Sequence, residues 1–155
     1  GYFSGVSAVQ FAPEQGLSRA MLVTVLWRMA GEPNAGVSTF ADVLPGGWYE
    51  KAVAWANTRG LVSGTGAGSF SPDAPITREQ LIAILWRYAG SPQPAGSLSA
   101  FADGAQTSAY AQTAMAWAVE TGLIGGSNGR LLPASGATRA QTALILQRFA
   151  AWMGM

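Results

Sequence analysis

The sequence of 155 residues contains no cysteine and no histidine. Without them the chain has no disulfides, no Ser-His-Asp or Cys-His arrangement for nucleophilic catalysis, and none of the usual zinc ligand sets. The carboxylates Glu50, Asp73, Glu79 and Glu120 do not recur in the other copies of the repeat described below, so no acid/base pair stands out. We therefore expect no enzyme activity, no metal and no cofactor.

Charge is also scarce, because only 11% of the residues are charged and nine basic residues face eight acidic ones. Lys51 is the single lysine. A chain with a net charge of +1 offers no basic face, so we expect no nucleic-acid partner. Hydrophobic residues make up 49% of the chain, but no run approaches the roughly 20 apolar residues of a membrane-spanning helix. We expect no membrane insertion.

An internal repeat organises the chain. The segment FAPEQGLSRAML begins at Phe11. A related segment begins 59 residues later at Phe70, and a third begins a further 61 residues along, at Leu131. A second motif, Phe-Ala-Asp, ends at Asp42 and Asp103 and occurs only twice. The spacing predicts repeats at approximately 1–33, 34–94 and 95–155, with the first half of the first repeat absent.

Each repeat is predicted to form a helix, a glycine-rich loop and a second helix. Thr77 with Gln80 and Thr138 with Gln141 match the capping box that begins a helix, whereas Ser18 is followed by Met21, which cannot complete a box. The links 33–39 and 91–99 are rich in Pro, Gly, Ser and Ala and are predicted to be exposed connectors.

An arginine follows the cap directly in all three copies, at Arg19, Arg78 and Arg139. A cation in the first helical turn opposes the helix dipole by about 0.3–1 kcal/mol, so some interaction must offset that cost. One interpretation is that each guanidinium reaches a carboxylate or backbone carbonyls of a neighbouring repeat. The other is that it captures a carboxylate or phosphate together with the free N–H groups of the helix start.

Two aspartates and the tryptophans likewise allow either a structural or a ligand-binding role. Asp42 and Asp103 are interpreted first as caps or turn-forming residues and second as ligand contacts. Most tryptophans at helical spacing are expected in the core, but Trp48, beside Gly46 and Gly47, is the best candidate for a platform on which a sugar ring packs. The matching position of the third repeat holds Ala109, so Tyr110 is the aromatic candidate there.

The ordered motifs resemble the S-layer homology (SLH) domain family. The resemblance rests on motifs such as Phe40-x-Asp42, Trp48-Tyr49, Ala54-Trp55-Ala56, Ile76-Thr77-Arg78-Glu79 and Leu85-x-Arg87-x-x-Gly90, and it covers nearly the whole chain. It implies an all-α, pseudo-threefold assembly of three tandem repeats, the first incomplete. It also implies a non-catalytic module that binds secondary cell wall polysaccharide linked to peptidoglycan in grooves between repeats. This polysaccharide is anionic and often carries pyruvate ketals.

The family's Thr-Arg-Ala-Glu motif maps onto Ser18–Met21, Thr77–Gln80 and Thr138–Gln141, where all three arginines are kept and the final glutamate is lost. The residue patterns and the resemblance together predict a set of ligand-binding residues: Arg19, Arg78, Arg139, Asp42, Asp103, Trp48, Tyr110, Gly64 and Gly126. The implied location is the cell surface or wall of a bacterium of Gram-positive type, after secretion. The alternative function is protein interaction or self-association through an apolar helix face left uncovered by the incomplete first repeat.

Overall fold

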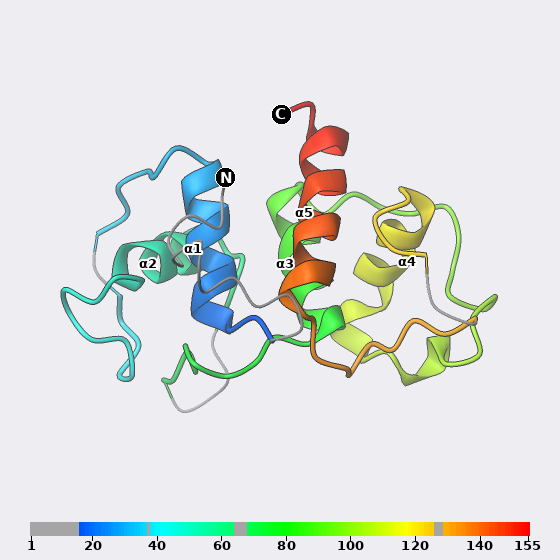
Figure 1. The fold of residues 1–155 in the computed structure, drawn as a ribbon, viewed down its shortest axis with the longest axis horizontal. Helices are drawn as coiled ribbons and strands as arrows, with labels where there is room; N and C mark the ends of the chain where they lie inside the picture. The colour runs from blue at the N-terminus through cyan, green and yellow to red at the C-terminus, as the bar shows by residue number, and fades with distance from the viewer. Residues whose placement is uncertain (1–15, 37, 64–67, 126–128) are drawn as a thin grey trace. The chain divides into compact units, whose positions relative to one another are not determined.

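The computed structural model describes residues 16–36, 38–63, 68–125 and 129–155. Within these ranges five α-helices follow one another: α1 (Arg19–Met29), α2 (Glu50–Thr58), α3 (Arg78–Tyr88), α4 (Gln112–Glu120) and α5 (Arg139–Met153). Two short 3-10 helices, η2 (Gly104–Gln106) and η3 (Ala109–Ala111), precede α4 (Figure 1). The described residues contain no β-strand, only two isolated bridges. The predicted all-α class is confirmed, while the pseudo-threefold arrangement and the repeat boundaries stay predictions.

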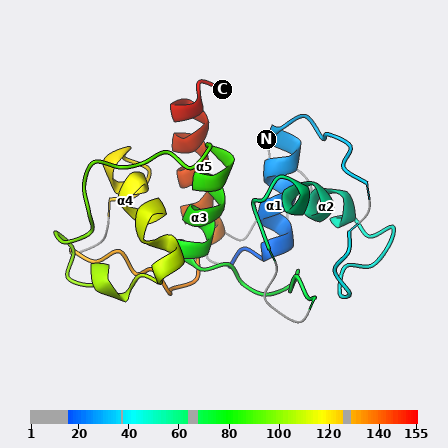
Figure 2. The same cartoon turned by 180° about the vertical axis from the view of Figure 1, so that it is seen from behind.

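The chain divides into two compact units, residues 1–75 and residues 76–155, called unit 1 and unit 2 below. Helix α1 packs against α2 in unit 1, and α3 packs against α4 in unit 2, as both views of the ribbon show (Figures 1 and 2). Each pair therefore joins the second helix of one sequence repeat to the first helix of the next.

Each unit has its own apolar core. In unit 1, Leu22 and Leu26 of α1 and Trp55 of α2 are buried. In unit 2, the ring of Phe149 on α5 meets the rings of Tyr88 and Trp117 edge-on, with centroids 5.7 and 6.4 Å apart. Trp55 and Trp117, which the sequence placed in helical stripes, are thus core residues.

The helix starts follow the predicted caps. The hydroxyls of Thr77 and Thr138 accept the backbone N–H of Gln80 and Gln141, and both glutamine side chains complete the capping box. Ser18 accepts the N–H of Met21 without a box. Because each box satisfies two otherwise unpaired N–H groups, Arg78 and Arg139 begin their helices at fixed positions, and the single cap of Ser18 sets that of Arg19.

The link between α3 and η2 is more firmly held than an exposed connector. The side chain of Leu98 is buried within it, at 4% exposure. The backbone N–H of Ala95 donates to the carboxylate of Glu120 at the end of α4. The prediction of an exposed connector is therefore wrong for Leu98, because an apolar side chain in a polar segment can anchor the segment to the core.

Candidate functional site

The arginines that begin α1 and α3 donate hydrogen bonds to backbone carbonyls of the next repeat. The Nε atom of Arg19 donates to the carbonyl of Phe70 and that of Arg78 to the carbonyl of Leu131, each at 2.9 Å. These bonds match the structural interpretation made from the sequence.

The two aspartates hold the turns to which these carbonyls belong. The carboxylate of Asp42 accepts the backbone N–H groups of Phe70 and Ser71, both at 2.8 Å. Asp103 accepts those of Leu131 and Leu132 at 2.8 and 2.9 Å. Ser71 and Leu132 have positive φ angles of 61° and 53°, a conformation that L side chains rarely adopt. The carboxylates therefore hold a strained turn 28 and 29 residues further along the chain, rather than forming the local cap or Asx turn that the sequence favoured.

These bonds also set the acidity of both carboxyl groups. The N–H of Phe70 lowers the pKa of Asp42, and the N–H of Leu131 lowers the pKa of Asp103, because a hydrogen-bond donor stabilises the ionised form. Burial opposes the shift in both cases. The negative charge of each aspartate is thus retained at neutral pH.

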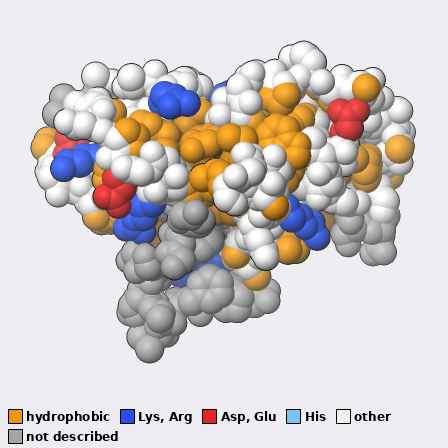
Figure 3. Space-filling model, turned by 90° about the horizontal axis from the view of Figure 1, so that it is seen from above, with side chains coloured by type: hydrophobic (Ala, Val, Ile, Leu, Met, Phe, Trp, Pro, Cys, Tyr) orange, Lys and Arg blue, Asp and Glu red, His pale blue; other side chains and the backbone are white. Residues whose placement is uncertain are grey.

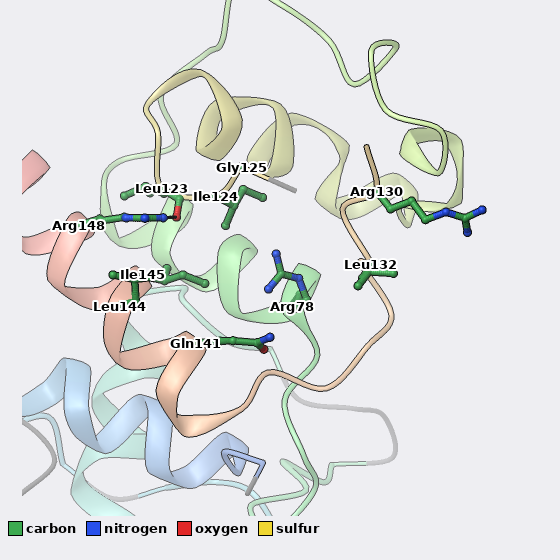
Figure 4. Close-up of a pocket in the computed structure, with 10 residues that line it drawn as sticks. All are labelled: Arg78, Leu123, Ile124, Gly125, Arg130, Leu132, Gln141, Leu144, Ile145 and Arg148. Carbon is green, nitrogen blue, oxygen red and sulfur yellow. Dashed lines mark hydrogen bonds between the residues drawn. The ribbon is translucent and has the colours of Figure 1, made fainter. Parts of the chain in front are cut away.

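A pocket of about 250 Å³ lies within unit 2, beside the start of α3. We call it the arginine pocket, because the guanidinium of Arg78 points into its centre and Arg148 enters from α5 (Figure 4). Gln141 lies on the α5 side, and Arg130 stands at the rim with its guanidinium directed away from the centre (Figure 4). The other lining residues are Leu123, Ile124, Gly125, Leu132, Leu144 and Ile145.

The electrostatics of the arginine pocket favour an anion. None of the described residues that line it is acidic. Burial lowers the pKa of Arg78 below its ordinary value, although arginine stays charged at neutral pH. Within the described residues, Nε is the one nitrogen of that guanidinium with a hydrogen bond. A half-buried cation with unused donors on an apolar wall is suited to an oxyanion.

The remaining predicted site residues are dispersed. Arg139 is buried at the start of α5, and Arg19 is buried in unit 1. Trp48 and Tyr110 are exposed, at 61% and 49%, and neither lines the arginine pocket. Gly64 and Gly126 lie outside the described residues, although Gly125 beside the latter does line the pocket.

The sequence reasoning missed two arginines of the pocket. Arg148 belongs to the Leu-x-Arg ending that all three repeats share, so its recurrence was visible. Arg130 has no such signal, because Ser69 stands at the matching position of the second repeat. Charge elsewhere is sparse, and Figure 3 shows few basic and acidic side chains, of both signs, among the apolar and neutral ones of one face. The arginine pocket is therefore a local concentration of cations rather than part of a basic surface.

The described residues contain neither a cluster of metal ligands nor a membrane-spanning helix. No three His, Cys, Asp or Glu side chains in this part of the chain come together as metal ligands would. None of the helices described is both long enough and apolar enough to cross a membrane.

Comparison with known proteins decides the family. A family model of the S-layer homology domain matches residues 39–82 and 100–143. The chain belongs to the S-layer homology domain family. It is 31% identical over 152 residues to the "Surface-layer 125 kDa protein" of Lysinibacillus sphaericus and 30% identical over 149 residues to an "Endoglucanase" of Bacillus sp. (strain KSM-635). These alignments cover 96% and 92% of this chain.

The SLH chain spans only 13% and 16% of the length of these two relatives. The matched segments of the family model contain Asp42 and Asp103 near their starts and Arg78 and Arg139 near their ends. Domains of this family bind cell-wall polymers, and the family points to the cell surface or cell wall. Arg78 and Gln141 of the arginine pocket lie within the matched segments, whereas Leu144, Ile145 and Arg148 lie just beyond them.

Proposed function

We propose that this SLH chain is a non-catalytic module that anchors a protein to the cell wall of a bacterium of Gram-positive type. Its ligand is an anionic secondary cell wall polysaccharide linked to peptidoglycan. The observation that carries the proposal is the arginine pocket, where Arg78 presents unused donors on an apolar wall with no acidic residue in the lining described.

The chemistry of the pocket favours a carboxylate over a bare phosphate. Ile124 and Ile145 line it beside the guanidinium of Arg78. A pyruvate ketal offers a carboxylate for Arg78 and a methyl group for these isoleucines, whereas a phosphate has no apolar part to bury. Arg148 and Gln141 would add donors for neighbouring oxygen atoms of the sugar.

Asp103 and Asp42 support this function through the turns that they hold. Because both oxygens of Asp103 accept backbone N–H groups, it positions the Leu131 carbonyl that orients Arg78. Trp48 and Tyr110 are exposed and stay proposed platforms for sugar rings.

The test is co-sedimentation of the chain with cell walls that keep their polysaccharide and with walls stripped of it by acid. We expect Arg78→Ala to weaken binding to intact walls by about 10- to 100-fold, which corresponds to the loss of charge-assisted hydrogen bonds. Arg59→Ala is the matched control, since Arg59 is an exposed arginine after α2. Equal binding to both kinds of wall, or unchanged binding of Arg78→Ala, would overturn the proposal.

Self-association is the second candidate, and one observation favours it. Apolar side chains are exposed at the end of α5 and just after it, at 42% for Trp152, 37% for Met153 and 53% for Met155. A second copy of the chain could cover them. This candidate predicts a dimer or larger species in light scattering, and a monomer at high concentration would exclude it.

A further inference from the structure

Unit 2 contains a second cavity, of about 270 Å³, between the link that precedes η2 and the first turns of α4. We call it the linker pocket. Its polar lining consists of Gln93, Ser97, Gln112 and Thr113, and its apolar lining includes Leu98 and Ala116. Unlike the arginine pocket, its described lining contains no charged side chain.

The wall of the linker pocket is held in place from both ends. The carboxylate of Glu120 accepts the backbone N–H of Ala95 at 3.1 and 3.2 Å. Leu98 is buried, and a Cβ atom on Gly104 would collide with the carbonyl oxygen of Leu98, so only glycine allows the backbone to approach this closely. A link fixed in this way loses little conformational freedom when a ligand binds.

This link is longer than its counterpart in the preceding repeat. Pro33 and Pro92 are 59 residues apart, whereas Phe40 and Phe101 are 61 apart, so the segment after Pro92 has two extra residues. Trp27 and Trp86 bond the carbonyls of these two prolines in the same way, which shows that both links start alike. The extra length falls in the segment that walls the linker pocket.

The polar groups of the linker pocket are amides and hydroxyls. The side-chain amide nitrogen of Gln112 donates to the carbonyls of Thr107 and Gly104, at 2.7 and 3.3 Å, which orients the amide and leaves its oxygen as an acceptor. The hydroxyl of Thr113 can both donate and accept. The hydroxyl of Ser97 donates to the hydroxyl of Ser99 at 3.1 Å and accepts the N–H of Ser99 at 3.4 Å, which leaves it one lone pair as an acceptor. The amide nitrogen of Gln93 donates to the carbonyl of Ser91 at 3.4 Å, and its oxygen stays an acceptor. Neutral groups of this kind above an apolar floor suit a ligand rich in hydroxyls and without charge.

We propose that the linker pocket binds one uncharged sugar residue, a neutral hexose or N-acetylhexosamine, of the polysaccharide whose anionic group enters the arginine pocket. This inference rests on the proposed function. The volume is just below the range of about 300–1,000 Å³ for drug-sized ligands, which suits a single sugar ring. Two subsites on one unit raise the effective concentration of the polymer at the second site once the first is filled.

The experiment titrates the full chain with N-acetylglucosamine and, separately, with glucose, and follows the backbone and side-chain amide signals by NMR. We expect at least one sugar to shift the signals of Gln112, Thr113 and Ser97 at millimolar concentration. Thr113→Val, which replaces the hydroxyl by a methyl group of similar size, should weaken that binding about 2- to 10-fold. Thr58→Val on the exposed end of α2 is the matched control and should leave it unchanged.

A second arm uses wall polysaccharide whose anionic groups have been removed by mild acid. Wild type and Arg78→Ala should bind this neutral polymer equally, and Thr113→Val and Ser97→Ala should bind it more weakly, provided that their NMR spectra show a folded chain. If neither sugar shifts the linker pocket and the neutral polymer does not bind, the inference is overturned while binding of the intact polymer still supports the proposed function. If the sugars bind and the intact polymer does not, the proposed function fails and the linker pocket stands as a separate sugar site.

Discussion

The two units use one arrangement of aspartate, turn and arginine in two different ways. In unit 1 the guanidinium carbon of Arg19 lies 4.8 Å from the centre of the Phe70 ring, and the side chain is only 7% exposed. In unit 2 the residue matching Phe70 is Leu131, and Arg78 is half-buried and lines a pocket. An aromatic ring at this position offers the guanidinium a partner inside the protein, whereas leucine offers none. The same motif is therefore enclosed in one unit and lines a pocket in the other.

The largest expected effect on stability comes from removing the buried arginine. We expect Arg19→Ala to lower the free energy of unfolding by about 2–3 kcal/mol, because the Phe70 carbonyl loses its donor and the ring loses its cation. Arg78→Ala should cost about 1 kcal/mol, the usual value of one hydrogen bond. Urea unfolding followed by tryptophan fluorescence measures both losses. Equal losses would contradict a stronger structural role for Arg19 than for Arg78.

Acid should weaken the turns held by Asp42 and Asp103, and the loss of the more buried Asp103 should lower stability more. The folded-state pKa values of Asp42 and Asp103 lie below 3.8, the value of the unfolded chain. Their ionised forms therefore stabilise the fold above about pH 3.8, and this stability is lost as the pH falls through the folded-state pKa. We expect Asp103→Asn to lower the unfolding midpoint at pH 6 more than Asp42→Asn, because Asp103 is 3% exposed and Asp42 is not fully buried.

The measurement is the urea midpoint at intervals from pH 6 to pH 2. Each asparagine variant should lose less stability than wild type over the acid range, because the amide does not titrate there. If the urea midpoint of both variants falls between pH 4 and pH 2 as steeply as that of wild type, other carboxyl groups cause the acid sensitivity.

The smallest effect should come from making unit 1 resemble unit 2 at a single position. Phe70→Leu removes the ring beneath Arg19 and its tilted contact with Phe40, whose centroid is 5.5 Å away. We expect a loss of about 1 kcal/mol, since leucine keeps most of the buried apolar volume. Calorimetric melting of this variant beside Arg19→Ala checks the order. A greater loss for Phe70→Leu would mean that ring packing, rather than the cation, holds this turn.

Local sequence patterns predicted the local structure of both units well. The capping boxes at Thr77 and Thr138 fixed the starts of α3 and α5, because a box involves residues only three apart. The role of Asp42 and Asp103 was not predicted in this way, because a cap or Asx turn is local, whereas their actual partners lie 28 and 29 residues further along the chain.

The arginine pocket could be predicted only in part. The recurrence of Arg78 marked it as a candidate, but the repeat alone could not distinguish it from Arg19, because the difference arises from the residue at 70 or 131. The place of Arg130 at the rim depends on how the turn after it is held, which no local pattern shows. The hydrogen bond from Ala95 to Glu120 joins residues 25 apart, so no local sequence pattern predicted it either.

The long reach of the arginines has a consequence for the order in which the chain can fold. Arg19 bonds a carbonyl 51 residues ahead and Arg78 one 53 residues ahead, so neither helix start is complete until half of the next repeat is present. During synthesis, α1 must wait for the Phe70 turn to leave the ribosome, and loop closure over this distance slows folding. A fragment cut at the sequence repeats would split both of these bonds between pieces. A fragment intended to fold alone should instead be cut half a repeat later, in the proline-containing stretch before Thr77.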